Sequence, residues 1–405
     1  MFRAALRDRG LLGQATSGLV AQLTQAAAGL GIILVVQAAG GSLALAGAAA
    51  AVFVIGAGAA RPVQGYLIDR HGARPVLVWS AVLHVAGAAA LVAFVELEGA
   101  QWPLLLLALP VGLGEPPVAQ SMRVTWAEIA REEDRTAAYS LITLIQELAV
   151  LFGPLLLAAI VALASASAAL LAVTALSGLG TFALALTLPG SSARAPRSRG
   201  RLPLRFAGVR AVLAVTALFG VSLGAVELAI PALTDERGEP AVSGLLLALM
   251  SVGGVGGAIV YGARRWRTGT ATHLVVLLGL LTVGLAPLIP SPSYVLMVVP
   301  LLIAGAAINP VVTAGALLIE DHAPSAAAEV FGWQSTALAT GAAAGSAVAG
   351  LVSRRRGPFG RVRGLGAGRG GGVRRRGARL APPWLAGQFR LESRRWQLER
   401  TASPA

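Results

Sequence analysis

Three glutamates and two glutamines stand inside long apolar stretches of this sequence, and they are the residues best placed to do chemistry. The glutamates are Glu115, Glu147 and Glu227, and the glutamines are Gln22 and Gln25. We find no arginine deep in the apolar stretches to pair with the acids, so we expect them to face water or to carry a proton. The glutamines offer both hydrogen-bond donors and acceptors to a polar ligand.

Each of these side chains also has a structural alternative. Glu115 and Glu147 either contact substrate or exchange protons, or they are neutral acids that hydrogen-bond inside a helix bundle. Glu227 has the weaker claim, because it lies nearer the end of its apolar stretch. Gln22 and Gln25 either contact substrate or hydrogen-bond between helices.

The composition indicates an integral membrane protein. Of 405 residues, 56% are hydrophobic and 13% are charged, and the mean hydropathy is +0.72. A soluble domain would carry about twice this share of charge. The chain has no cysteine, and its four histidines lack metal-ligand spacing, so we expect no metal and no cofactor. No nucleophile–base constellation is present, so we expect no enzyme.

Eleven apolar segments are each long enough to cross a bilayer as a helix, which takes about 20 residues. A basic linker over residues 191–208 separates six of these segments from the other five. We therefore expect an N-terminal six-helix bundle over residues 1–190 and a C-terminal bundle over residues 209–352. The expected helices cover about residues 11–39, 42–67, 75–95, 102–125, 136–162, 166–188, 209–233, 241–262, 272–289, 294–319 and 326–352.

The placement of arginine predicts the orientation. Arginines gather at the N-terminus and in the loops after the second, fourth, sixth and eighth segments. Because cytoplasmic loops are enriched in Lys and Arg, we expect a multi-pass protein with a cytoplasmic N-terminus. The expected location is the cell inner (plasma) membrane, so the lipid bilayer is an expected partner.

A short polar hinge joins the second and third segments and reads Gly65-Tyr-Leu-Ile-Asp69-Arg70-His-Gly72-Ala-Arg74. Glycine at the first position permits close backbone approach, and Gly72 permits a tight turn. This spacing closely resembles motif A of the major facilitator superfamily, the cytoplasmic loop between helices 2 and 3. The resemblance implies an all-α transporter built from two pseudo-symmetric six-helix bundles, here with about 11 transmembrane helices because helix 12 is missing.

The resemblance also implies a gating role for the hinge. In this family the motif A acid lies against the N-terminal end of helix 11, where the helix dipole favours negative charge. Asp69 matches that acid, and the matching helix end begins near Ser325. The implied contact is a latch that closes the cytoplasmic side, and the alternative is that these charges only fix topology. Any ion pair from the hinge to Glu128 would use Arg70 or Arg74.

The activity that the resemblance implies is secondary active transport of a small-molecule substrate by alternating access, and we expect proton-coupled efflux by a monomer. Two features depart from the drug–proton antiporters of the family. Leu109 stands, before Gly112, where those proteins carry an arginine, and Gly153-Pro154 is followed by leucines instead of a glycine pair. Uptake on the same fold and a transport-inactive membrane sensor or scaffold therefore stay open as alternatives.

The net charge of +14 belongs mostly to the C-terminal tail. Fourteen of the 33 arginines lie from Ser353 onward. The positive charge is therefore not a property of the whole chain, as it would be in a nucleic-acid-binding protein, and we expect no nucleic-acid partner. Residues 353–405 contain no run long enough for a twelfth membrane helix. We expect this stretch to be a disordered or frameshifted tail, and translation of the other two reading frames would test the frameshift.

Overall fold

The computed structural model describes residues 9–97, 102–188, 203–264, 266, 268–288 and 293–356. The regular structure in this part of the chain is helical, and nine of its helical spans are long and apolar enough to cross a membrane. Helices suit a bilayer because their interior backbone groups pair within the segment, where lipid supplies no hydrogen bonds. The predicted tail from residue 357 onward and most of the predicted linker lie outside the described residues.

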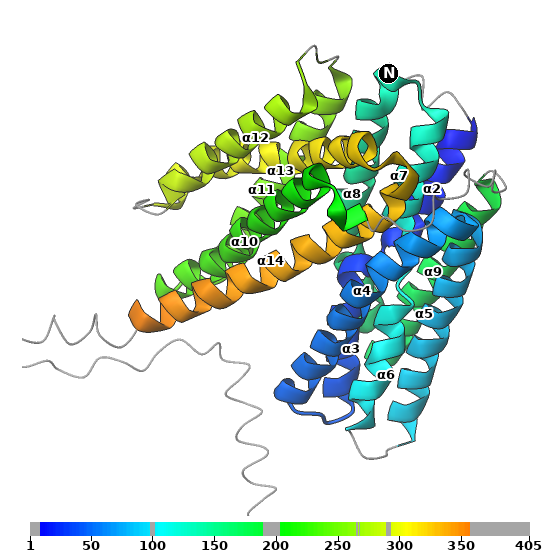
Figure 1. The fold of residues 1–405 in the computed structure, drawn as a ribbon. Coiled ribbons are helices and arrows are strands. Elements are labelled where there is room, and N and C mark those ends of the chain that lie inside the picture. The colour runs from blue at the N-terminus through cyan, green and yellow to red at the C-terminus, as the bar shows by residue number, and fades with distance from the viewer. Residues whose placement is uncertain are drawn as a thin grey trace, which may run out of the picture. The chain divides into compact units, whose positions relative to one another are not determined.

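The first group of helices, drawn in blue to green in Figure 1, precedes the linker. Helix α4 packs against α6, α5 packs against α6 and α9, and α2 packs against α9. These helices are α2 (Arg9–Gln22), α3 (Thr24–Ala38), α4 (Leu43–His71), α5 (Ala73–Glu96), α6 (Pro103–Leu113), α7 (Val118–Ile129), α8 (Arg135–Leu163) and α9 (Ala166–Thr187).

The second group follows the linker and is drawn in green to orange in Figure 1. Helix α13 packs against α11 and α12, and α8 of the first group contacts both α11 and α13. The helices are α10 (Ala207–Glu236), α11 (Val242–Ala263), α12 (Thr270–Leu285), α13 (Tyr294–His322) and α14 (Ala327–Arg356).

Two crossings that the sequence predicted as long helices are divided in the structure. The first is interrupted at Leu23, between α2 and α3. The fourth, expected over residues 102–125, is divided by a break at Gly114–Pro117, whereas Pro110 lies inside α6. Adjacent prolines lack backbone N–H groups and disfavour helical geometry in the preceding residue, so a helix cannot continue through Pro116 and Pro117.

Two predicted helix ends were also wrong by a turn. Helix α13 continues through Glu320, Asp321 and His322, which the sequence predicted as a loop. Helix α14 continues to Arg356, past the predicted end at Val352. Both corrections extend a helix into polar residues, because hydropathy marks where a segment leaves the apolar core and does not mark where helical hydrogen bonding stops.

Close packing of α10 against α14 depends on glycine. A Cβ atom added at Gly224 would overlap the backbone oxygen of Ala342. Nearby, the hydroxyl of Ser346 on α14 donates a hydrogen bond of 2.9 Å to the carbonyl oxygen of Gly224. Small residues at such a crossing let two membrane helices approach closely enough for backbone contact.

Candidate functional site

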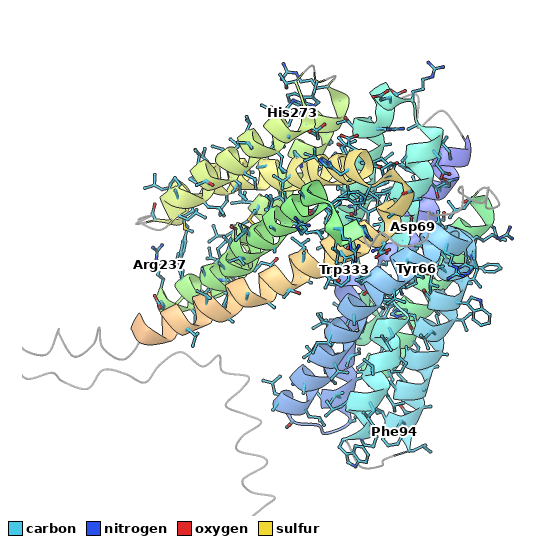
Figure 2. The ribbon with its side chains drawn as sticks, in the orientation of Figure 1. Tyr66, Asp69, Phe94, Arg237, His273 and Trp333 are labelled. Carbon is cyan, nitrogen blue, oxygen red and sulfur yellow. The ribbon has the colours of Figure 1, made fainter. Side chains whose placement is uncertain are left out.

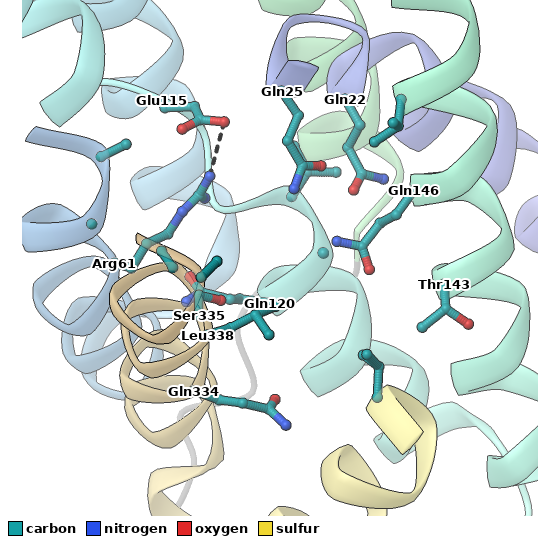
Figure 3. Close-up of a pocket in the computed structure, with 18 of the residues that line it drawn as sticks. Gln22, Gln25, Arg61, Glu115, Gln120, Thr143, Gln146, Gln334, Ser335 and Leu338 are labelled. Atoms are coloured by element: carbon teal, nitrogen blue, oxygen red, sulfur yellow. Dashed lines mark ion pairs between the residues drawn. The ribbon is translucent and has the colours of Figure 1, made fainter. Parts of the chain in front are cut away.

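A cavity of about 500 Å³ lies among the helices, with walls from both groups. Its size is within the range of about 300–1,000 Å³ that is usual for small-molecule sites. Figure 3 shows its polar side chains approaching from several helices. The charged and amide-bearing residues that line it are Gln22, Gln25, Arg61, Glu115, Gln120, Arg123, Gln146, Glu147, Glu227, Asn309 and Gln334.

The structure brings together all five residues that the sequence singled out for substrate or proton binding. Gln22, Gln25, Glu115, Glu147 and Glu227 line this one cavity. They come from α2, α3, the break before α7, α8 and α10, so no local spacing links them. Their roles in substrate or proton binding stay predictions, but all five side chains lie at one site.

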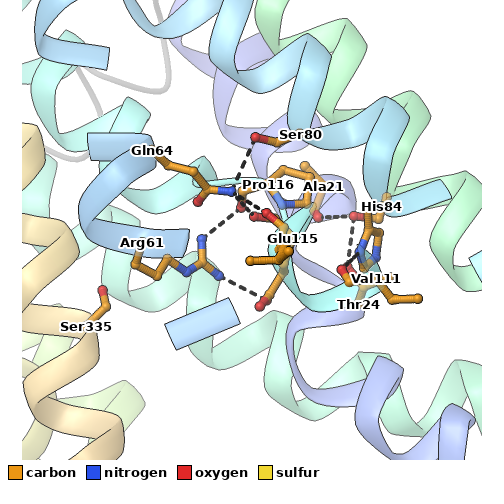
Figure 4. A network of polar contacts seen from close by, with 12 residues as sticks. Ala21, Thr24, Arg61, Gln64, Ser80, His84, Val111, Glu115, Pro116 and Ser335 are labelled. Carbon is orange, nitrogen blue, oxygen red and sulfur yellow. Dashed lines mark hydrogen bonds and ion pairs between the residues drawn. The ribbon is translucent and has the colours of Figure 1, made fainter. Parts of the chain in front are cut away.

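The expectation that no arginine lies deep enough to pair with the acids was wrong for Glu115. Arg61 on α4 places Nη2 3.0 Å from Oε1 of Glu115, and both side chains are largely buried. Its Nη1 donates a hydrogen bond of 3.1 Å to the carbonyl oxygen of Pro116 (Figure 4). Arg61 lies within the predicted second helix, but only the packing of α4 against α6 shows that its side chain reaches the break in the fourth crossing.

Gln64, a second hydrogen-bond donor on α4, contacts the same break in the fourth crossing. Nε2 of Gln64 lies 3.1 Å from the carbonyl oxygens of both Leu113 and Glu115, and 3.3 Å from Oγ of Ser80 (Figure 4). A broken helix leaves carbonyl groups without N–H partners, which is costly where no water is present. Arg61 and Gln64, three residues apart on α4, supply the missing donors.

Sequence reasoning also missed Arg123, a second guanidinium in the cavity wall. Arg123 is buried on α7, and its Nη2 donates a hydrogen bond of 3.0 Å to Oε1 of Gln146 on α8. Its guanidinium carbon lies 5.7 Å from the centre of the Phe331 ring on α14, within the range of a cation–π contact. Arg123 follows Gln120 by three residues, which places both side chains on one face of a helix. This spacing was the sequence feature that could have revealed Arg123.

Glu147 lies where the two groups of helices meet. Oε1 of Glu147 on α8 and Nδ2 of Asn309 on α13 both approach Gly254 on α11, at 3.8 and 3.1 Å from the position of a Cβ there. Among the described residues Glu147 makes no ion pair. Glu147 therefore differs from Glu115, whose charge is balanced by a guanidinium.

Asp69 contacts the first turn of α14, the helix end that the motif A resemblance predicts. The backbone N–H groups of Ala328 and Glu329 donate to its two carboxylate oxygens at 3.2 and 2.9 Å. A Cβ at Gly65, one turn earlier on α4, would overlap the backbone oxygen of Ala328. Figure 2 marks Asp69 and Tyr66 on this part of α4. The first-turn N–H groups lack partners within a helix, so a carboxylate both caps them and complements the helix dipole.

The rest of the hinge lies at the boundary between α4 and α5. Gly72 has φ of +86°, a conformation that favours glycine, and connects the two helices directly. Nη1 of Arg70 donates a hydrogen bond of 3.1 Å to the hydroxyl of Tyr66, and Arg74 is exposed. The ion pair from Arg70 or Arg74 to Glu128 stays a prediction.

Three solved structures share this fold across most of their length. A bacterial homologue of the iron transporter ferroportin, in an outward-facing state, has a TM-score of 0.66 at 17% identity and covers 87% of this chain and 92% of its own. The human organic anion transporter TETRAN has a TM-score of 0.64 at 19% identity, covering 84% and 92%. The fucose:proton symporter of E. coli has a TM-score of 0.63 at 15% identity, covering 86% and 92%.

The sequence comparisons give the family. No curated protein sequence matches this chain significantly. The family model of the major facilitator superfamily matches residues 13–346, which is most of the chain. With its apolar helices and its fold, this match identifies the chain as a multi-pass membrane transporter that belongs to the major facilitator superfamily.

Proposed function

We propose that this chain is a proton-coupled secondary transporter of a small polar solute, which works by alternating access, and that Glu147 binds the coupled proton. The observation that carries the proposal is the position of Glu147, a carboxylate in the wall of a cavity to which both groups of helices contribute. An acid at such a place changes its surroundings when the two groups rearrange. Its protonation can therefore be linked to the state of the transporter.

Glu147 fits this role better than Glu115, which the sequence also favoured. Protonation of Glu115 would break a 3.0 Å ion pair with Arg61 and leave that guanidinium without its carboxylate. Leaving one partner of a buried ion pair alone is strongly unfavourable. Glu147 has no such partner among the described residues, and Glu227 in the same cavity is the second candidate.

The contact of Asp69 with α14 supplies the second part of the proposal. It joins a helix of the first group to a helix of the second at one end of the molecule, so we assign it the role of a latch that holds that end closed. Release of the latch would open this end while the opposite end closes. Export of the solute in exchange for protons is the direction that we propose, and uptake is the alternative outcome of a flux measurement.

Distances between pairs of spin labels test the coupling without knowledge of the substrate. The chain has no native cysteine, so labels can be attached at Arg131→Cys with Asp321→Cys, across the Asp69 end, and at Leu43→Cys with Glu239→Cys, across the opposite end. In reconstituted protein we expect acidification to shift the two distance distributions in opposite directions. Glu147→Gln should remove this response.

Two matched variants in the same cavity make the result specific. Glu115→Gln, whose folding is checked first because it leaves Arg61 without its carboxylate, should keep the response to pH, since the proposal gives Glu115 no part in proton exchange. Glu227→Gln shows whether the second candidate acid in the cavity contributes. A response of wild-type size in Glu147→Gln would refute the assignment, and a loss confined to Glu227→Gln would move the coupled proton to α10.

A further inference from the structure

The cavity concentrates side-chain amides. The chain contains eleven glutamines and one asparagine, and six of these twelve residues line the cavity. They lie on six helices, which are α2, α3, α7 and α8 of the first group and α13 and α14 of the second. The six are Gln22, Gln25, Gln120, Gln146, Asn309 and Gln334.

Two of these amides have polar atoms that are buried and lack a hydrogen-bond partner in the described structure. They are Oε1 of Gln22 and both polar atoms of Gln120. Both residues are at most 4% exposed. Buried polar atoms in proteins are almost always paired, so unpaired ones in the wall of a cavity mark positions where ordered water or a bound ligand supplies the missing hydrogen bonds.

The unpaired atoms include both donors and acceptors. An amide nitrogen donates and an amide oxygen accepts, and Gln120 has both kinds free whichever way its amide is turned. A hydroxyl group can satisfy either kind, because it is a donor and an acceptor at once. An ammonium group can serve only the acceptors, and a carboxylate can serve only the donors.

The charges in the cavity do not favour an anion. Arg61 is paired with Glu115, and Arg123 donates to Gln146 while it lies over the Phe331 ring. An entering anion would thus meet two guanidinium groups that already have contacts, together with the carboxylates of Glu147 and Glu227. A neutral ligand avoids this repulsion.

We propose that the substrate is a neutral, polyhydroxylated solute of the size of a sugar or cyclitol, bound through the amides of this cavity. The proposal rests on the proposed function, because it takes the cavity as the transport site. It adds the chemical class of the substrate, which the family and the fold leave open.

Binding to the purified full-length chain tests the class directly. Isothermal titration with glucose, xylose, sorbitol and myo-inositol is compared with glucuronate as an anion, glucosamine as a cation and cyclohexylmethanol as an apolar ring compound. We expect at least one neutral polyol to bind more tightly than all three comparison compounds. If a charged compound or cyclohexylmethanol binds best, or if no polyol binds, the proposed class is wrong.

Amide variants then locate the binding. Gln120→Leu should weaken polyol binding about three- to tenfold, the usual loss for a neutral hydrogen-bond pair. Gln25→Leu tests an exposed lining residue whose replacement does not disturb buried packing, and it should weaken binding by a similar factor. Gln37→Leu, an exposed amide on α3 outside the cavity lining, should leave binding unchanged. Equal affinity in the two lining variants and the wild type would overturn the assignment.

The two proposals fail in different ways. Polyol binding without any dependence of the spin-label distances on Glu147 would leave the substrate class standing and remove the proton coupling. A Glu147-dependent response to pH without polyol binding would do the reverse.

Discussion

The ion pair between Arg61 and Glu115 gives the sharpest test of how this membrane core is held together. Its atoms are 3.0 Å apart, and the two side chains are 15% and 9% exposed. Arg61→Met removes the positive charge and keeps an unbranched apolar side chain. The variant leaves the buried carboxylate of Glu115 without its counter-ion, and it removes one of the two donors to the carbonyl oxygen of Pro116, the other being the backbone N–H of Val118.

The expected cost of Arg61→Met follows from these two losses. Removing one partner of a buried ion pair destabilises a protein by about 3–5 kcal/mol, because the remaining charge is left uncompensated. A large chain loses roughly 2 °C of its unfolding temperature for each kcal/mol. Purified Arg61→Met in detergent should therefore unfold roughly 5–10 °C below the wild type.

A double-mutant cycle separates the ion pair from ordinary packing loss. Arg61→Met with Glu115→Met removes both charges, so it should be more stable than Arg61→Met alone, with a coupling of about 1–3 kcal/mol. Arg131→Met, at an exposed arginine, should unfold like the wild type. If Arg61→Met unfolds at the wild-type temperature, or if the two single effects add without coupling, then the pair does not stabilise the break in the fourth crossing.

Two further predictions concern the helix contacts around the cavity. Asp69→Asn removes the charge that faces the first turn of α14, a contact worth about 0.3–2 kcal/mol, so the spin-label pair at Arg131 and Asp321 should report more of the state in which this end is open. Asp235→Asn, at an exposed site on α10, is its control, and an unchanged distribution in Asp69→Asn would contradict the latch. Gly224→Ala should lower the unfolding temperature by an amount equivalent to about 1–3 kcal/mol, because its Cβ would overlap the backbone of α14. Gly256→Ala, which has open space, should instead be neutral or stabilising by about 0.5–1 kcal/mol, and equal effects of the two changes would refute the packing argument.

The sequence by itself determined the fold class and most of the membrane helices. Hydropathy and length locate an apolar segment without knowledge of its neighbours, because the bilayer itself sets both requirements. The hinge from Gly65 to Arg74 indicated the family, which the family model over residues 13–346 confirmed. The sequence also selected five polar residues that line the cavity, because a polar side chain inside an apolar segment needs a special reason.

Only the tertiary structure decided how these residues are paired. Arg61 and Glu115 are 54 positions apart, and helical periodicity shows which residues share a face of one helix without showing which face of another helix it meets. For the same reason, the sequence did not reveal that Arg123 lines the cavity, or that six amide side chains from six separate helices line it together. Which carboxylate has a counter-ion and which does not is thus a property of helix packing, because ion pairing depends on distances between side chains that the order of the chain leaves open.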